Sequence, residues 1–176
     1  VGNHCARLGE VALYSEFAFQ GALISSNVVD DAAAGISVTN FNEGGRLAVV
    51  QGNLIRNLKR REFEPEDKRG EGIAVEADAA VTGNVIENAP TAGIMIGWTH
   101  WMREVVASSN VIRNARIGIA VTADPAAGAV MIANNMISGT REGAIRGMQK
   151  AVPVGPDLAK SPPVSARVAV VGNVAV

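Results

Sequence analysis

Aromatic residues and cysteine are scarce in this chain of 176 residues. Aromatics make up only 4% of it, although hydrophobic residues reach 48%. The core must therefore consist of Val, Ile, Ala and Leu, which suit short strands. The single cysteine, Cys5, excludes an internal disulfide and a multi-cysteine metal site. We predict no metal and no cofactor.

Charges of the two signs are nearly balanced. Sixteen basic and seventeen acidic residues leave a net charge of −1, which offers no basic patch for nucleic acid. No apolar run approaches the roughly 18 residues of a membrane span, and the first residues lack the regions of a secretory signal peptide. We therefore expect no nucleic-acid partner and no membrane span.

One short pattern recurs along the chain. In "TGNVIENAPTAGIMIG" (82–97), Gly-Asn precedes two apolar residues, and Gly-Ile-x-Ile follows. Related segments align on Asn3, Asn27, Asn53, Asn84, Asn110, Asn135 and Asn173. The spacings of 24, 26, 31, 26, 25 and 38 residues indicate an array of one structural unit with two insertions.

Each unit has the pattern of three short strands. An alternating apolar segment precedes the asparagine, an apolar pair follows it, and Gly with a second alternating segment completes the unit. A polar or glycine corner follows the apolar pair, at Asp31, Asn57, Asn88, Asn114 and Gly139. We predict an all-β protein: a right-handed, single-stranded parallel β-helix of about six to seven coils, with an asparagine ladder at one corner.

On these repeats the chain resembles the pectate-lyase-like superfamily of β-helix proteins. Within it, the chain is most similar to an α-proteobacterial family of repetitive proteins exported by the twin-arginine route. The resemblance covers nearly the whole chain and implies export to the periplasm or the cell surface. It also implies that a substrate would lie in a groove over the Gly-Ile-x-Val strand.

The repeated asparagines have a structural explanation. A tight corner requires a left-handed backbone, which Gly and Asn adopt with little strain. An Asn amide can also donate to the carbonyl of its copy about 4.8 Å away in the next coil. None of the seven is followed two places on by Ser or Thr, so none is a glycosylation site. We predict a structural ladder.

Alternation predicts which side chains face inward. One column comprises Val29, Ile55, Ile86, Ile112 and Ile137. A second comprises Ile36, Ile73, Ile94 and Ile119, beside Val38, Val75, Ile96 and Val121. Cys5 falls in the first column, which favours a small buried hydrophobe over a nucleophile.

The repeat predicts a single β-helix domain over residues 1–176, with loop insertions at 59–71 and 147–166. Both ends fall at the same corner of the coil, "VGN" and "VGNVAV". Such ends leave apolar faces and unpaired backbone open. We expect a fragment of a longer solenoid, or further coils or partner chains over the ends.

Catalysis would have to arise on the outward face of the Gly-Ile-x-Val strands. The outward positions are Ser37, Thr39, Ala74, Glu76, Met95, Gly97, Ala120, Thr122 and Ile145 or Arg146. Glu76 is the only carboxylate among them, so an acid–base pair about 5–10 Å apart needs a second carboxylate from a loop. Asp67, Asp78 and Glu104 are the loop candidates. We predict no complete catalytic constellation and keep Glu76, Asp78, Glu104 and His100 as catalytic candidates.

The segment "GWTHWMRE" (97–104) carries both tryptophans of the chain. Trp98 and Trp101 could stack on sugar rings, with His100 and Arg103 adding hydrogen bonds. The alternative is that the tryptophans cover the side of the helix. We predict a ligand site at these four residues and leave that alternative open.

The two insertions differ in composition. "KRREFEPEDKRGE" (59–71) has nearly balanced charges and is typical of a solvated loop, or it forms a groove wall with Arg60, Arg61 and Asp67. "QKAVPVGPDLAKSPP" (149–163) is rich in proline, which argues against a strand and favours a flap or docking arm.

An apolar residue follows each ladder asparagine, and alternation directs it outward. The positions are Val28, Leu54, Val85, Val111, Met136 and Val174. Six apolar side chains in a row exceed scattered exposure. We predict an interface there, with tucking at the corner as the alternative.

The sequence leaves three functions open. The first is an exported β-helix protein that binds or presents to carbohydrate at the cell envelope, without demonstrable catalysis. The second is a polysaccharide lyase or glycoside hydrolase, and the third is a structural or assembly module.

Overall fold

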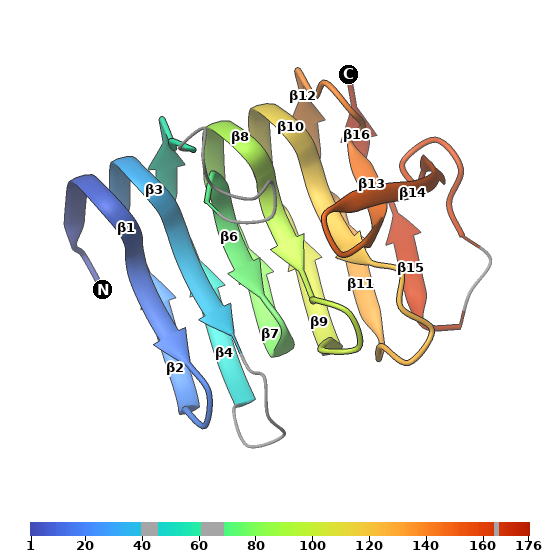
Figure 1. Cartoon of the computed structure of the whole chain (residues 1–176), viewed down its shortest axis with the longest axis horizontal. Helices are drawn as coiled ribbons and strands as arrows, with labels where there is room; N and C mark the ends of the chain where they lie inside the picture. Colours follow the sequence, from blue (N-terminus) through green and yellow to red (C-terminus); the bar gives the residue numbers. More distant parts are fainter. Residues whose placement is uncertain (40–45, 61–68, 164–165) are drawn as a thin grey trace.

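The computed structural model describes residues 1–39, 46–60, 69–163 and 166–176. The described chain winds into successive coils that follow one another along the longest axis (Figure 1). No helix occurs in the described ranges, and neighbouring coils pair through parallel strands. The protein is a right-handed parallel β-helix, as the repeat predicts.

The strands form two sheets. The ten-stranded sheet comprises β1 (His4–Glu16), β3 (Val28–Thr39), β5 (Leu54–Arg56), β6 (Glu71–Val75), β8 (Val85–Ile96), β10 (Val111–Thr122), β12 (Met136–Ser138), β13 (Ile145–Gln149), β14 (Val152–Asp157) and β16 (Val174–Ala175). The six-stranded sheet comprises β2 (Gln20–Ser25), β4 (Arg46–Gln51), β7 (Ala77–Thr82), β9 (Arg103–Ser108), β11 (Val130–Ala133) and β15 (Val168–Val171). In β1, β3, β8 and β10 the second and third predicted strands are one continuous strand, whereas β5 and β6 flank the first insertion.

The core is a set of stacked aliphatic columns. Register pairs Ile36 with Ile73, Ile73 with Ile94, and so on along the axis, so every coil repeats the contact of its neighbour. The predicted inward residues Val29, Ile55, Ile86, Ile112, Ile137, Ile36, Ile73, Ile94, Ile119, Val38, Val75, Ile96 and Val121 are all buried. Cys5 packs against this core and is partly buried.

The predicted asparagine ladder runs through the described coils. Each ladder Nδ2 donates to Oδ1 of the next ladder residue at 2.8–3.0 Å, from Asn3 to Asn173. The same Oδ1 also accepts the backbone N–H of the preceding ladder asparagine, at 3.0 Å for Asn84 on Asn110. Because the inner asparagines are 0–1% exposed, these bonds replace water that the amides have lost.

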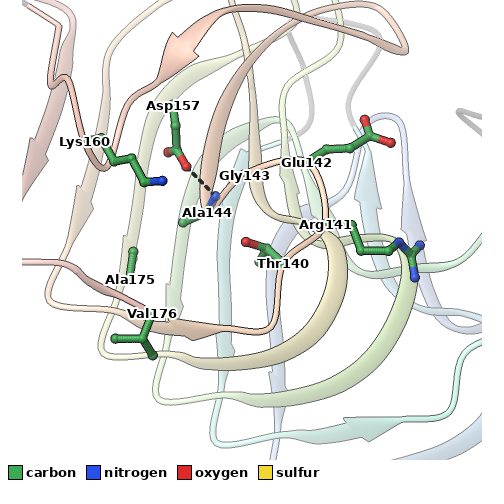
Figure 2. Close-up of a pocket in the computed structure, with 9 residues that line it drawn as sticks. All are labelled: Thr140, Arg141, Glu142, Gly143, Ala144, Asp157, Lys160, Ala175 and Val176. Atoms are coloured by element: carbon green, nitrogen blue, oxygen red, sulfur yellow. Dashed lines mark hydrogen bonds between the residues drawn. The ribbon is translucent and has the colours of Figure 1, made fainter.

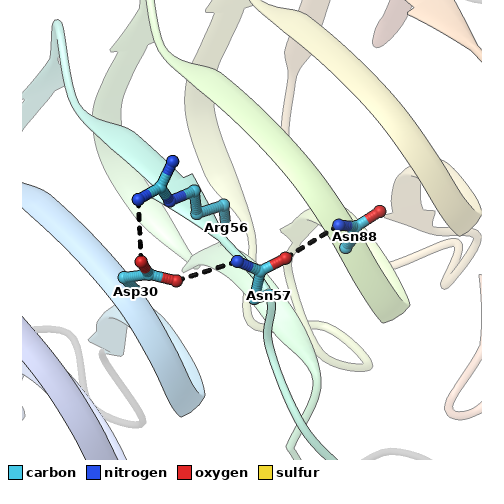
Figure 3. A network of polar contacts seen from close by, with 4 residues as sticks. All are labelled: Asp30, Arg56, Asn57 and Asn88. Atoms are coloured by element: carbon cyan, nitrogen blue, oxygen red, sulfur yellow. Dashed lines mark hydrogen bonds and ion pairs between the residues drawn. The ribbon is translucent and has the colours of Figure 1, made fainter.

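The left-handed residue at this corner precedes the ladder asparagine. It is Gly2, Ser26, Gly52, Gly83, Ser109, Asn134 or Gly172, all with φ between 55° and 69°. The second corner is left-handed at Asp31, Asn57, Asn88, Asn114 and Gly139, as predicted. There Asn88 Nδ2 donates to Asn57 Oδ1 at 2.8 Å, and Asn57 Nδ2 to Asp30 Oδ1 at 2.9 Å (Figure 3).

The glycine of the Gly-Ile-x-Val pattern is required by close stacking rather than by a turn. A Cβ on Gly93 would lie 2.7 Å from the Gly118 carbonyl oxygen, and one on Gly118 would lie 2.5 Å from that of Ala144. Gly35 and Gly72 are equally tight against the next coil. The backbones of adjacent coils therefore lie too close together at this glycine column to admit a side chain.

The prediction for the second insertion is wrong in part. Residues 152–157, within the predicted loop 147–166, form β14, which pairs antiparallel with β13. Pro153 and Pro156 are tolerated because β14 has a partner on one side only and is an edge strand. The first insertion lies largely outside the described residues.

Candidate functional site

The predicted groove floor is the outward face of the Gly-Ile-x-Val segments. Two rows of outward side chains cross the coils there. Register aligns the first row as Tyr14, Ser37, Ala74, Met95, Ala120 and Arg146. The second row contains Glu16 with Thr39, then Glu76 and Gly97 one residue beyond their paired strands, and Thr122 with Met148. The floor therefore changes from acidic in the first coils to apolar and hydroxylated at Met95, Ala120 and Thr122, and ends at Arg146 and Met148.

Much of this outward face is closed to solvent. Ser37, Ala74, Glu76, Ala120 and Thr122 are only 3–8% exposed. The side chains are mostly short, and on the C-terminal half Ile117 and Met148 pack against Ala120 in a second apolar cluster. The C-terminal half of the floor nevertheless opens to solvent at one pocket.

A pocket of about 390 Å³ opens at the C-terminal half of the floor. Its lining comprises Thr99, Thr122, Ala123, Asp124, Pro125, Met148, Gln149, Lys150 and Val154. A narrower recess continues from it toward Trp98, Met95 and Gly97. The pocket thus combines a thioether, hydroxyls, a carboxylate and an ammonium, and the recess beside it adds Trp98. Such a mixture is typical of small polar ligand sites.

One wall of this pocket is the hairpin of β13 and β14. Asp157 anchors it, because its carboxylate accepts N–H groups of Ala144 at 2.8 Å, Ile145 at 3.1 Å and Ala159 at 3.0 Å. Burial alone would raise the pKa of the Asp157 carboxyl, but these three donors hold it below its ordinary value. Arg146 adds bonds to the carbonyls of Glu142 and Gly155.

The other wall is the turn between β8 and β9. Trp98 and Trp101 exchange backbone hydrogen bonds at 3.2 and 3.0 Å, which closes the turn. Thr122 Oγ1 donates to the Thr99 carbonyl at 2.6 Å and ties the turn to β10. Trp98 lines the recess, whereas the Trp101 ring stacks on His100, with centroids 4.4 Å apart. Both tryptophans are half-buried, but of the two only Trp98 lines the recess beside the pocket.

The predicted polar residues near this turn have other partners. Arg103 forms a two-point ion pair with Asp78 of the preceding coil, at 3.0 and 2.9 Å. This ion pair links β9 to β7 and engages two of the predicted site residues, Arg103 and Asp78, with each other. Glu104 is exposed, with a φ of 51°. His100 is exposed and lies against Trp101 rather than in the pocket.

An acidic group lies at the opposite end of the floor. Burial, a hydrogen bond to Glu16 and the charges of Glu16 and Glu76 raise the pKa of Tyr14, while Thr39 acts in the opposite direction. Glu16 is a second carboxylate on the same face as Glu76, and sequence reasoning missed it because the first coil carries only a weak repeat.

A larger pocket of about 510 Å³ lies at the last described coil, beside Thr140, Lys160 and Val176 (Figure 2). Its charged groups are mostly engaged within the protein. Glu142 accepts from Arg116 at 2.7 Å, which lowers the pKa of Glu142, and Arg141 donates to the Pro90 carbonyl. Asp157 holds the backbone of Ala144 there (Figure 2). The 390 Å³ pocket, by contrast, lies on the predicted groove floor.

Of the proposed groove-wall residues in the first insertion, Arg60 is half-buried, whereas Arg61 and Asp67 lie outside the described residues. The predicted stripe stacks in register and stays accessible, with Leu54 37%, Val85 41% and Met136 45% exposed. Val28 and Val111 are half-buried. Whether the stripe is an interface stays a prediction.

In the described ranges, no group of three or more His, Cys, Asp or Glu side chains is placed to hold a metal ion. The described residues also include no helix long and apolar enough to cross a membrane. Comparisons with family models, curated proteins and solved structures each return nothing similar to this chain.

Proposed function

We propose that this β-helix binds carbohydrate, holding one or two sugar rings over β10 and β13. The supporting observation is the 390 Å³ pocket, next to the recess that Trp98 lines. An aromatic face packs against the apolar face of a pyranose, and the nearby Thr99, Asp124 and Lys150 suit its hydroxyls or carboxylate. The repeat resemblance supports a place in the twin-arginine-exported family and at the bacterial envelope.

The two tryptophans provide a matched test. Trp98→Ala should weaken binding of oligosaccharides about tenfold or more, whereas Trp101→Ala should change it little, because Trp101 stacks on His100 outside the pocket. Isothermal titration with neutral and uronate oligosaccharides measures both. Loss of uronate binding alone in Lys150→Ala would assign the ammonium to a sugar carboxylate. Equal effects of the two tryptophan variants, or no binding to either sugar class, would contradict the proposal.

A second candidate is a lyase or hydrolase at the acidic end. The observation that favours it is the presence of Glu16 and Glu76 on the same face. Burial and the negative charges of both carboxylates raise the pKa of Tyr14. Release of reducing or unsaturated sugar should then fall in both Glu16→Gln and Glu76→Gln. Binding without turnover would favour the first candidate. The absence of both binding and turnover would favour the structural module.

A further inference from the structure

Two outward rows run side by side along the narrow face between the ladder corner and the second corner. The apolar row consists of Val28, Leu54, Val85, Val111, Met136 and Val174, stacked in register. The charged row lies two residues further along each strand and consists of Asp30, Arg56, Glu87 and Arg113. Because the side chains of residues i and i+2 share a face, both rows point to the same side.

Both rows are at least partly accessible to a partner, with Val28 and Val111 half-buried and the Asp30 side chain 25% exposed. Exposure in the apolar row is 37% for Leu54, 41% for Val85 and 45% for Met136. In the charged row, the side chains of Arg56 and Arg113 are 46% and 59% exposed. The face therefore offers apolar contact and charge together.

The charges of the second row alternate in sign from coil to coil. Within the chain, Arg56 pairs with Asp30 at 2.8 Å (Figure 3), and Arg113 with Glu87 at 3.7 Å. Exposed pairs of this kind contribute little to folding, typically below about 1 kcal/mol. The alternation nevertheless imposes a pattern that a copy of the same face can match.

The pattern is self-complementary in one orientation. Suppose that a second copy faces the first with its helix axis antiparallel. The charged row, which reads minus, plus, minus, plus along one copy, then meets plus, minus, plus, minus on the other. Asp30 then faces Arg113 and Arg56 faces Glu87, each twice by symmetry. The same register places Leu54 against Val85 and Val28 against Val111. A parallel arrangement in the same register places like charges opposite one another.

We propose that this face is a docking surface for a second copy of the chain, related by a two-fold axis that runs along the strands between the coils of Arg56 and Glu87. The interface is isologous, as two-fold contacts are. Two rows over six coils at about 4.8 Å cover only a few hundred Å² per copy, less than the roughly 800 Å² of a standard interface. Association is therefore weak and needs high local concentration.

Charge reversal separates this contact from pairing within the chain. Arg56→Glu and Glu87→Arg should each raise the dimer dissociation constant about tenfold or more, because like charges then meet twice per dimer. The double variant carrying both changes should associate like the wild type. An equimolar mixture of the two single variants should form a heterodimer. In that mixture one copy is acidic at both positions and the other is basic at both, so opposite charges meet at each contact.

Sedimentation equilibrium of the whole chain over a wide concentration range measures these constants. Circular dichroism confirms that each variant is folded. The mixing result cannot arise from charge pairs within one chain, so it distinguishes the proposal from simple stabilisation of the coils. A monomeric wild type at all concentrations would overturn the proposal, and so would self-association that the single reversals leave unchanged. Neither outcome would affect carbohydrate binding at the Trp98 pocket.

Discussion

Removing one rung of the ladder tests the physical basis of the fold. Asn110 Oδ1 accepts the backbone N–H and the Nδ2 of Asn84, both at 3.0 Å. Its Nδ2 donates to Asn135 Oδ1 at 2.9 Å and to the Val81 carbonyl at 3.1 Å. Asn110→Ala removes all four bonds at a site that is 1% exposed.

The four losses are not equal. Asn84 Nδ2 keeps the Val50 carbonyl, and Asn135 Oδ1 keeps the Asn110 backbone N–H. The Asn84 backbone N–H keeps no acceptor, and a buried orphan costs about 1–3 kcal/mol. With about 0.5–1.5 kcal/mol for each of the three other bonds, we expect a loss of about 2.5–7.5 kcal/mol in the free energy of unfolding.

Urea unfolding followed by circular dichroism measures this loss. Asn3→Ala is the matched control, because the exposed Asn3 side chain makes one ladder bond, to Asn27 Oδ1, and should cost about 1 kcal/mol or less. At about 2–4 °C per kcal/mol, Asn110→Ala should lower Tm by roughly 5–30 °C. If the two variants lose equal stability, the ladder does not hold the coils together and the reasoning is refuted.

Three further outcomes follow from the contacts. Gly118→Ala should lower the free energy of unfolding by about 3 kcal/mol or more, because its Cβ would lie 2.5 Å from the Ala144 carbonyl oxygen. Gly83→Ala faces open space at a φ of 64° and should cost about 1–2 kcal/mol. Thermal unfolding measures both. The folded pKa of Asp157 is lowered, so its stabilisation is present above its unfolded pKa of about 3.9 and is lost as pH falls through the folded value. Amide exchange in the β13–β14 hairpin should rise selectively on acidification, and Asp157→Asn should remove that pH dependence. Tyr14 is the only tyrosine, so ultraviolet titration should show its raised pKa directly and a lower one in Glu16→Gln.

The sequence predicted the parts of the fold that each coil repeats. A corner restricts the backbone to a left-handed residue, and stacking restricts the ladder and the inward columns to Asn and aliphatic side chains. Asn84 and Ile86 are recognisable because their environments recur in every coil. The glycine before Ile94 also recurs, but its reason, contact with the Gly118 carbonyl, requires the spacing of the coils.

The candidate site was harder to predict because it lies where the repeat is interrupted. Pro153 and Pro156 favoured a loop, yet an edge strand needs hydrogen bonds on one side only. The alternation Val152, Pro153, Val154 was the available signal. The spacing did not indicate that Asp157 would hold this hairpin over Met148. The contact joins one carboxylate to backbone N–H groups, which every non-proline residue has, so the sequence carries no sign of it.

Positions that recur in a solenoid are largely assigned to stacking, so recognition must come from positions that depart from the repeat. The turn at Trp98 and the hairpin after β13 are two such departures, and they enclose the same pocket. The alternating charges at Arg56 and Glu87 are a third, because their sign repeats every second coil while the backbone repeats every coil. Ion pairs between adjacent coils use this alternation within the chain, and an antiparallel copy of the face can match the same pattern. The charge-swap mixture therefore tests whether departure from the repeat is a general guide to function in this chain.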